Sequence, residues 1–258
     1  MKKILFPIFV IGATALLVAG CAAPPSTETS ATPLASSAVQ ETAAPVSDLP
    51  AAVGKLHWFG TSAILYHGSK NIYFDPVTLD GELPKADFIF ISHAHPDHAD
   101  LESLQQIIGP GTILIISPNV QGFYQAHPHE IGVVPLIMKE GDTEKFGDIQ
   151  VEAVPAYDDQ IHLRSSEGAG FVVSIDGERI YFAGGTRVFP EMAQIVSDVA
   201  LYPWYRNADI LAAAEILQTK VLIPVHAGAS GVKAFVDVYG KEITRLKVIA
   251  LEPGPYNP

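Results

Sequence analysis

The feature that most constrains this chain is an apolar strand that runs directly into a cluster of metal-binding side chains. Phe88–Ser92 is apolar up to its final serine, which is typical of a strand buried on both faces. The next six residues, 93–98, read HAHPDH and contain three histidines and one aspartate. Ligand sites in α/β folds lie at the carboxyl ends of strands. The strand and the cluster therefore predict an α/β protein with a metal site at a strand end.

The residue types of the cluster favour a metal ion over other ligands. Neutral imidazole is the commonest protein ligand of zinc, and carboxylate oxygen also serves. Three of the nine histidines of the chain fall in this tract, too many for incidental surface histidines. The single cysteine, Cys21, excludes an internal disulfide and cysteine-rich zinc modules. We predict one or two ions held by His, Asp or Glu, with zinc preferred and manganese or iron as alternatives.

From Val53 onward, short apolar runs alternate with turn signals. Most runs are rich in β-branched or aromatic residues and are predicted as strands. The predicted strands are 56–59, 63–66, 71–74, 88–92, 112–116, 149–154, 170–175, 179–182, 199–202, 221–225 and 246–249. Helical periodicity occurs over 100–108, 191–196, 208–218 and 232–239. Asp176-Gly177 predicts a hairpin between two strands. This mixture favours an α/β sandwich over a barrel.

The N-terminal region is organised like the leader of a secreted protein. Residues 1–20 have a basic start, a short apolar stretch and a small-residue end, which predicts a signal peptide. The sequence LVAGC at 17–21 resembles the lipobox of bacterial lipoproteins, which implies that Cys21 carries lipid. Residues 21–52, mostly Ala, Pro, Ser and Thr, predict a disordered tether, and the domain is predicted at 53–258. We expect an envelope protein anchored by lipid, in the outer membrane facing the periplasm if the bacterium is Gram-negative.

The charge of the chain limits its partners. The formal net charge is −12, from 16 basic against 28 acidic residues. Such a chain repels the phosphates of nucleic acid, so nucleic-acid binding is not expected. The expected partners are a small-molecule substrate and, through the lipid, a membrane. The sequence offers no positive indication of a protein partner.

The cluster also resembles a known family. His-x-His-x-Asp-His after an apolar strand resembles the signature of the metallo-β-lactamase superfamily. Further stretches resemble its other motifs in the same order, and the opening hairpin resembles the lactonase-like branch of metal-dependent hydrolases. These stretches are 59–62 with 71–76, 154–157, 179–186 and 224–226. The resemblance implies a four-layer αββα sandwich. It also implies a first metal on His93 and His95 and a second on Asp97, His98 and His226.

The sequence departs from the family pattern at two positions, and a third ligand is ambiguous. The aspartate that bridges both metals in relatives falls on Gly185, and Thr61 replaces a histidine common in this branch. His162 is predicted to complete the first site because no other histidine follows Tyr157 before His226. Asp158 and Asp159 are the alternatives for that ligand.

Two hypotheses for function follow from the resemblance. The first is an envelope-anchored hydrolase in which metal-bound hydroxide attacks an ester, lactone, amide or phosphodiester. Asp97 would act there as general base or orient the water. The second is a degenerate lipoprotein that binds metal or ligand with little hydrolysis, because Gly185 cannot coordinate. Hydrolysis of β-lactams belongs to another branch and is less favoured. The substrate stays open, because specificity depends on loops around the metals.

Overall fold

The computed structural model describes residues 49–258 of the chain. The predicted signal peptide, Cys21 and most of the predicted tether lie outside these residues. Among the described residues, no helix has the length and apolar character needed to cross a membrane. The fold below is that of the described part alone.

The first sheet begins the domain and combines a meander with parallel strands. Its strands, in spatial order, are β1 (Leu56–Gly60), β2 (Ala63–His67), β3 (Asn71–Phe74), β4 (Phe88–Ile91), β5 (Ile113–Ile116) and β6 (Leu136–Ile137). The strands β1, β2 and β3 are antiparallel neighbours, whereas β3 to β6 run parallel to one another. The carboxyl ends of β3 and β4 therefore meet at one edge.

The second sheet contains the remaining strands of the described chain. Their spatial order is β13 (Lys247–Val248), β12 (Val221–Val225), β11 (Val199–Pro203), β10 (Glu178–Phe182), β9 (Ala169–Ile175), β8 (Ile149–Pro155) and β7 (Thr143–Phe146). From β10 to β13 the strands are parallel, and from β7 to β10 they are antiparallel. This sheet again presents several carboxyl ends at one edge.

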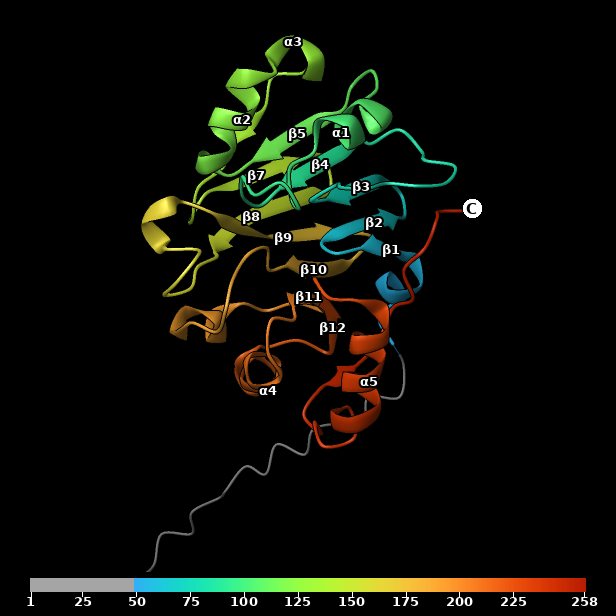
Figure 1. Ribbon diagram of the computed structural model, residues 1–258, viewed down its shortest axis with the longest axis vertical. Helices are drawn as coiled ribbons and strands as arrows, with labels where there is room; N and C mark the ends of the chain where they lie inside the picture. The colour runs from blue at the N-terminus through green and yellow to red at the C-terminus, as the bar shows by residue number, and fades with distance from the viewer. Residues whose placement is uncertain (1–48) are drawn as a thin grey trace, which may run out of the picture. The chain divides into compact units, whose positions relative to one another are not determined.

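The two sheets pack face to face, and helices cover their outer faces. Aromatic side chains of both sheets meet in the shared core, where ring centroids lie 5.0 Å apart for Phe74–Phe182 and 5.1 Å apart for Phe90–Phe171. The helices α1 (Leu101–Ile107), α2 (Gln121–Ala126) and α3 (Pro128–Ile131) lie beside the first sheet, and α4 (Asn207–Ile216) and α5 (Ala229–Tyr239) beside the second (Figure 1). This is the predicted four-layer αββα sandwich.

The strand before the histidine cluster shows why a continuous apolar run was needed. In β4, Phe88 and Phe90 belong to the core between the sheets. Ile89 and Ile91 belong to the core between the first sheet and its helices. Because alternate side chains of a strand point to opposite faces, a strand covered on both sides must be apolar throughout. The predicted buried strand is confirmed.

Most predicted elements are present, and the differences have physical causes. The predicted helix 191–196 is a short 3-10 helix, η4 (Pro190–Gln194). The short elements β6, β7, α2 and α3 were not predicted. The strand β7 has mostly exposed positions and pairs only with β8 among the described strands, so its sequence lacks an apolar alternation. The predicted hairpin at Asp176-Gly177 is present, and both residues have positive φ, as a type I′ turn requires.

The described structure includes a short helix that starts before the predicted domain boundary at 53. The 3-10 helix η1 covers Ala51–Lys55, and Ala52 is fully buried. The backbone N–H groups of Ala51 and Ala52 donate to the two carboxylate oxygens of Glu178, at 2.7 and 2.6 Å. The start of the domain is thus fixed to the start of β10.

Candidate metal centre

The predicted site residues come together where strands of both sheets end. His93 to His98 follow β4, and Asp75 follows β3 in the first sheet. In the second sheet, His162 lies in the loop after β8, Gly185 after β10, and His226 directly after β12. Segments more than a hundred residues apart therefore supply one cluster. The arrangement explains why a sandwich is required to assemble it.

The first ligand group consists of His93, His95 and His162. One nitrogen from each lies within 4.8 Å of the others. The distance between His93 Nε2 and His95 Nδ1 is 3.2 Å. Tetrahedral zinc with bonds of about 2.05 Å places neighbouring nitrogens roughly 3.3 Å apart. The spacing of these nitrogens fits one ion with a position left open for water or substrate.

The second ligand group consists of Asp97, His98 and His226. The Nε2 atoms of His98 and His226 lie 3.0 Å apart, and Asp97 Oδ2 lies 3.2 Å from His226 Nε2. Asp97 Oδ2 is farther from His98 Nε2, at 3.9 Å. The Asp97 side chain is half exposed to solvent. The group has the composition of a second metal site that opens to solvent.

A buried aspartate not singled out from the sequence supports both groups. Asp75 is fully buried, and its carboxylate accepts hydrogen bonds from Ser92 N at 2.7 Å and Ser92 Oγ at 2.6 Å. His98 Nδ1 donates to Asp75 Oδ2 at 2.5 Å. Because this bond occupies Nδ1, Nε2 of His98 is left to face the second group. Asp75 lies in the stretch 71–76, which was quoted for its family resemblance, so a signal for it was present.

The three candidates for the third ligand, His162, Asp158 and Asp159, differ in their contacts. His162 Nδ1 bonds to Asp158 Oδ2 at 2.9 Å, and Asp158 also accepts from the backbone N–H groups of Gln160 and Ile161. Nε2 of His162 is buried and has no partner among residues 49–258. A buried nitrogen rarely stays unpaired, whereas a metal ion would satisfy this lone pair. Asp159 points away, with 84% of its side chain exposed.

The electrostatic setting keeps the imidazoles in the form that binds metal. Burial, and then the neighbouring histidines, lower the pKa of His93 far below its ordinary value. Burial also lowers the pKa of His95 and His226, with His162 and His98 respectively as the next contributions. Neutral imidazole is the ligand form. These histidines therefore need not lose a proton at neutral pH before they coordinate.

Gly185 lies directly against the first ligand group. A Cβ atom on this residue would be 2.7 Å from His93 Cε1 and 2.8 Å from His162 Nε2. The volume that a side chain would need at this position is therefore taken by the two imidazoles. The departure from the family pattern is accompanied by close packing of His93 and His162 around the glycine.

The backbone that presents His226 is strained. His226 has a φ of 65°, and its N–H donates to the carbonyl oxygen of Thr61 at 2.7 Å. Thr61 itself has a φ of 44°, and its carbonyl oxygen also accepts from Trp58 Nε1 at 3.0 Å. Left-handed backbone at non-glycine residues persists where surrounding contacts hold it, and it is common at functional sites. Thr61 thus positions His226 through its carbonyl.

One aromatic residue near the site was missed by sequence reasoning. The ring of Tyr205 lies edge-on to His226, with centroids 4.9 Å apart, and parallel to His162 at 6.2 Å. Its hydroxyl is buried and has no partner among the described residues. Burial raises the pKa of Tyr205, with the Asp97 carboxylate as the next contribution, so the hydroxyl keeps its proton. Nothing in the sequence around Tyr205 distinguishes it from a core tyrosine.

Comparison with known proteins gives the family of the chain. The model of the family described as "Beta-lactamase superfamily domain" matches residues 55–226. A UPF0173 metal-dependent hydrolase of Archaeoglobus fulgidus is 32% identical, in a comparison that covers 67% of this chain and 82% of the relative. A UPF0173 metal-dependent hydrolase of Methanospirillum hungatei is 28% identical, over 78% of this chain and 96% of the relative. The predicted superfamily and hydrolase class are confirmed.

Solved structures agree with this placement. A metal-dependent hydrolase of Parabacteroides distasonis is similar, with a TM-score of 0.62, 25% identity, and coverage of 76% of this chain and 93% of that one. A metallo hydrolase of Ignicoccus hospitalis shares the fold, with a TM-score of 0.59, 24% identity and coverage of 77% and 95%. The fold, the family match and the clustered histidines agree: the chain belongs to the β-lactamase superfamily, among its UPF0173 metal-dependent hydrolases.

Proposed function

We propose that this protein is an envelope-anchored hydrolase that cleaves an ester, lactone, amide or phosphodiester in a small molecule. The observation that carries the proposal is the buried, unpaired Nε2 of His162, a residue that has a ring nitrogen within 4.8 Å of ligand nitrogens of His93 and His95. Three protein ligands with an open position are characteristic of a catalytic rather than a structural zinc site. The half-exposed Asp97 beside this group supports the same conclusion.

Different residues would bind the metal and orient the attacking water. When bound, a divalent metal lowers the pKa of water to about 7 and polarises the bond under attack. His93, His95 and His162 would hold the ion, and Asp158 fixes the orientation of His162. Asp97, with one side open to solvent, orients the attacking water and accepts its proton.

Tyr205 is suited to a complementary role. Its buried hydroxyl is unpaired within residues 49–258 and lies on a ring packed between His162 and His226. Because burial keeps it protonated, the hydroxyl can donate a hydrogen bond but cannot act as a base at neutral pH. A donor near the open position would stabilise negative charge that develops on the substrate oxygen.

Zinc is the ion that best suits the first ligand group. Three neutral imidazoles form a borderline ligand set that suits zinc, and iron or manganese accept the same donors. A second ion on Asp97, His98 and His226 would be held more weakly, because Gly185 supplies no bridging carboxylate between the two groups. We therefore propose one tightly bound zinc and a weaker second site.

A degenerate protein that binds metal without turnover is the second candidate. Gly185 favours it, because the carboxylate that joins both metals in relatives is lacking. The close approach of His93 and His162 to Gly185 argues the other way, since both imidazoles still converge on the first group. The two candidates differ in turnover rather than in metal content.

Metal analysis combined with a hydrolysis screen tests the proposal. Purified protein reconstituted with zinc, manganese or ferrous iron should retain close to one equivalent of metal after gel filtration, with zinc retained best. A panel of p-nitrophenyl esters, lactones and bis(p-nitrophenyl) phosphate should then show metal-dependent turnover. Retained metal without turnover on any of these would favour the degenerate protein. Protein that retains no metal would refute both candidates.

The proposed location rests on the sequence of the N-terminal region. The residues 17–21 resemble a lipobox, and the first described helix, at Ala51–Lys55, is bonded to Glu178 of the domain. The roughly 30 residues between Cys21 and Pro50 would let the domain stand off a membrane by about 30 Å as a flexible coil. We propose lipid attachment at Cys21 and a position in the cell envelope.

A further inference from the structure

A cavity beside the metal centre gathers most of the arginines of the chain. The cavity has a volume of about 520 Å³, within the range of small-molecule sites. Its lining includes Arg164, Arg187 and Arg206, which are three of the five arginines in the whole sequence. A chain of net charge −12 repels anions in general, so a local group of arginines is needed to attract one.

Arg187 differs from its neighbours because its guanidinium faces two carboxylates at ion-pair distance and makes no hydrogen bond to either. Its nearest carboxylate oxygens are Asp159 Oδ1 at 3.7 Å and Asp209 Oδ2 at 3.8 Å, both beyond hydrogen-bond distance. Only 19% of its side chain is exposed. Asp209 is already occupied by two hydrogen bonds from Arg206 at 3.1 Å. The Arg187 donors are therefore sheltered from bulk water and held only by two long ion pairs, which leaves them free to form hydrogen bonds with a closer anion.

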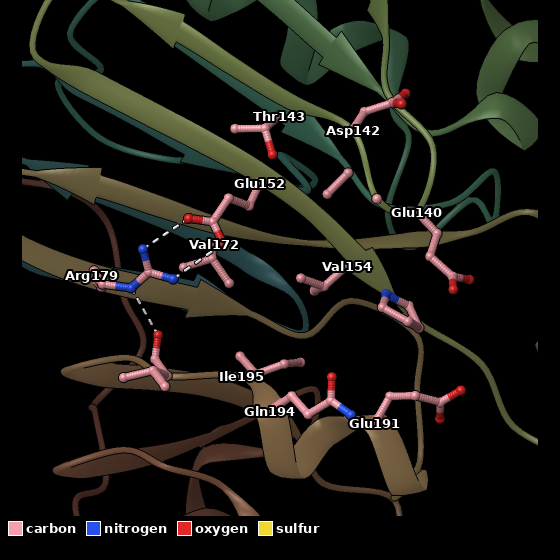
Figure 2. Close-up of a pocket in the computed structure, with 14 residues that line it drawn as sticks. Glu140, Asp142, Thr143, Glu152, Val154, Val172, Arg179, Glu191, Gln194 and Ile195 are labelled. Atoms are coloured by element: carbon pink, nitrogen blue, oxygen red, sulfur yellow. Dashed lines mark hydrogen bonds and ion pairs between the residues drawn. The ribbon is translucent and has the colours of Figure 1, made fainter.

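A second cavity on the domain contains an arginine whose guanidinium is hydrogen-bonded to neighbouring residues. This cavity, of about 380 Å³, lies on the outer face of β8 to β10 beside η4 (Figure 2). There Arg179 donates to Glu152 at 2.9 and 3.2 Å and to the carbonyl oxygen of Val196 at 2.9 Å. Its guanidinium is thus fully engaged, as Figure 2 shows. Arg179 is a structural arginine and serves as the matched control for Arg187.

The Arg187 cavity adjoins the first ligand group by two routes. Asp158, which lines the cavity, holds His162 through a 2.9 Å bond. Gly185, whose Cβ position would touch His93 and His162, precedes Arg187 by two residues, a span of at most about 7 Å between Cα atoms. A small molecule whose reacting bond lies at the ligand group could therefore reach Arg187 with another part.

The remaining walls of the cavity also suit an organic ligand. Tyr157 and Phe189 line it and stack on each other, with ring centroids 4.8 Å apart. Asp158, the third acidic group in the wall beside Asp159 and Asp209, is saturated by His162 and backbone N–H groups, so it does not compete for Arg187. The cavity thus combines an apolar wall with a cation that has no hydrogen-bonded carboxylate.

We propose that Arg187 binds an anionic group of the substrate, a carboxylate or a phosphate, away from the bond that is cleaved. A guanidinium pairs with either group through two parallel hydrogen bonds. The inference rests on the proposed hydrolase function and narrows its substrates to small molecules that carry a second, negatively charged group. Arg187 is then a specificity-determining residue rather than a metal ligand.

Kinetics with a matched pair of esters test this proposal. The probes are p-nitrophenyl acetate, which is neutral, and mono-p-nitrophenyl glutarate, which carries a free carboxylate. The zinc-loaded protein should prefer the acidic ester in kcat/KM. Arg187→Gln should lower kcat/KM for that ester about 10-fold or more, through KM, and leave the neutral ester within about two-fold. Arg179→Gln should change neither. The proposal would be overturned if Arg187→Gln and the parent showed the same ratio of kcat/KM between the acidic and the neutral ester.

A binding measurement separates this inference from the hydrolase proposal itself. Calorimetric titration with glutarate and with inorganic phosphate, each on zinc-loaded and zinc-stripped protein, needs no turnover. Binding of either anion that survives zinc removal and is lost in Arg187→Gln supports the inference, and the better ligand distinguishes carboxylate from phosphate. Arg187→Lys keeps the positive charge and should retain part of the anion binding. It is the control that shows whether a loss in Arg187→Gln comes from a folding defect. No Arg187-dependent binding refutes the inference, whatever the hydrolysis screen shows.

Discussion

At the scale of single residues, His162 is held on one side and open on the other. Asp158 binds its Nδ1, and its Nε2 is buried without a partner in the described chain. His162→Ala should therefore remove tight metal binding, because two imidazoles alone hold zinc poorly. Asp158→Asn should weaken metal affinity about 10- to 100-fold, because it releases the orientation of His162. Metal content after competition with a chelator measures both effects.

The control for this prediction is a histidine outside the centre. His129 is exposed in α3, and it belongs to none of the ligand groups found among residues 49–258. His129→Ala should leave metal content unchanged. If His162→Ala retained as much metal as His129→Ala, the assignment of His162 to the first group would be wrong.

Gly185 gives a second prediction at this scale. Its Cβ position meets His93 and His162 at under 3 Å, so Gly185→Ala should force both imidazoles to shift. Overpacking of this kind costs about 1–3 kcal/mol in the free energy of unfolding and should lower metal affinity as well. Gly122→Ala is the matched control, since nothing lies within 4 Å of the added atom. Urea denaturation and metal titration measure the two effects.

Gly185→Asp extends the same argument to the residue found in relatives. Because the β-carbon itself conflicts with the two histidines, the carboxylate should not restore a bridged pair of metals in this chain. We expect less metal and less turnover than in the parent. A large gain in both would instead show that the natural protein is the degenerate one.

The sequence revealed some of these residues and not others for a simple reason. The cluster from His93 to His98 is contiguous, so its chemistry is visible without a fold. His162 was preferred over Asp158 and Asp159 from the sequence, but the supporting role of Asp158 depends on which way its side chain points. Tyr205 approaches the centre, and Arg187 the cavity beside it, only through tertiary packing, and no local pattern marks either residue.

At the scale of elements, prediction succeeded where burial shapes the sequence. The strand β4 is covered on both faces and had to be apolar throughout, so it was found within one residue. The strand β7 and the helix α2 contribute no buried residue, and their sequences carry no periodicity that distinguishes them from loops. The segment of η4 was predicted as an α-helix but forms a 3-10 helix in which only Met192 is buried.

The turn between β9 and β10 supports a prediction about acid stability. Asp176 Oδ2 accepts hydrogen bonds from Lys55 Nζ and from Tyr66 OH, both at 2.7 Å. The Lys55 bond, and then that of Ser69, lower the pKa of Asp176 below its unfolded value of about 3.9. A depressed folded pKa contributes stability above pH 4, and this contribution is lost as pH falls through the folded pKa.

Asp176→Asn isolates that contribution because asparagine tolerates the positive φ of this turn. The variant should lose about 1–2 kcal/mol of unfolding free energy at pH 7 and show a shallower loss of stability below pH 4. Urea denaturation at a series of pH values measures both. Asp148→Asn, at the exposed β7–β8 turn, should behave as the parent. An unchanged acid slope in Asp176→Asn would contradict the argument.

At the scale of the whole molecule, the sandwich itself makes the centre. Ligands from β4, β8 and β12 converge because the two sheets place these strand ends at a common edge. The sequence predicted this arrangement through family resemblance, since pattern alone indicates only an α/β sandwich. The helix η1 could not be predicted, because Ala51 and Ala52 resemble the tether in composition and are fixed by tertiary contacts, namely the bonds to Glu178 and the burial of Ala52 in the core.

The attachment of the molecule to a membrane is tested by its single cysteine. If Cys21 carries lipid, Cys21→Ser should move the protein from the membrane fraction to the soluble fraction and abolish incorporation of labelled palmitate. The domain should keep its melting temperature and metal content, because Cys21 precedes the first described residue by 28 positions and η1 is fixed to β10 by bonds within the domain. Ala22→Asp should keep the lipid and, in a Gram-negative host, retain the protein in the inner membrane. Equal fractionation of Cys21→Ser and the parent would show that residues 1–20 act as an uncleaved anchor or that another contact holds the protein at the membrane.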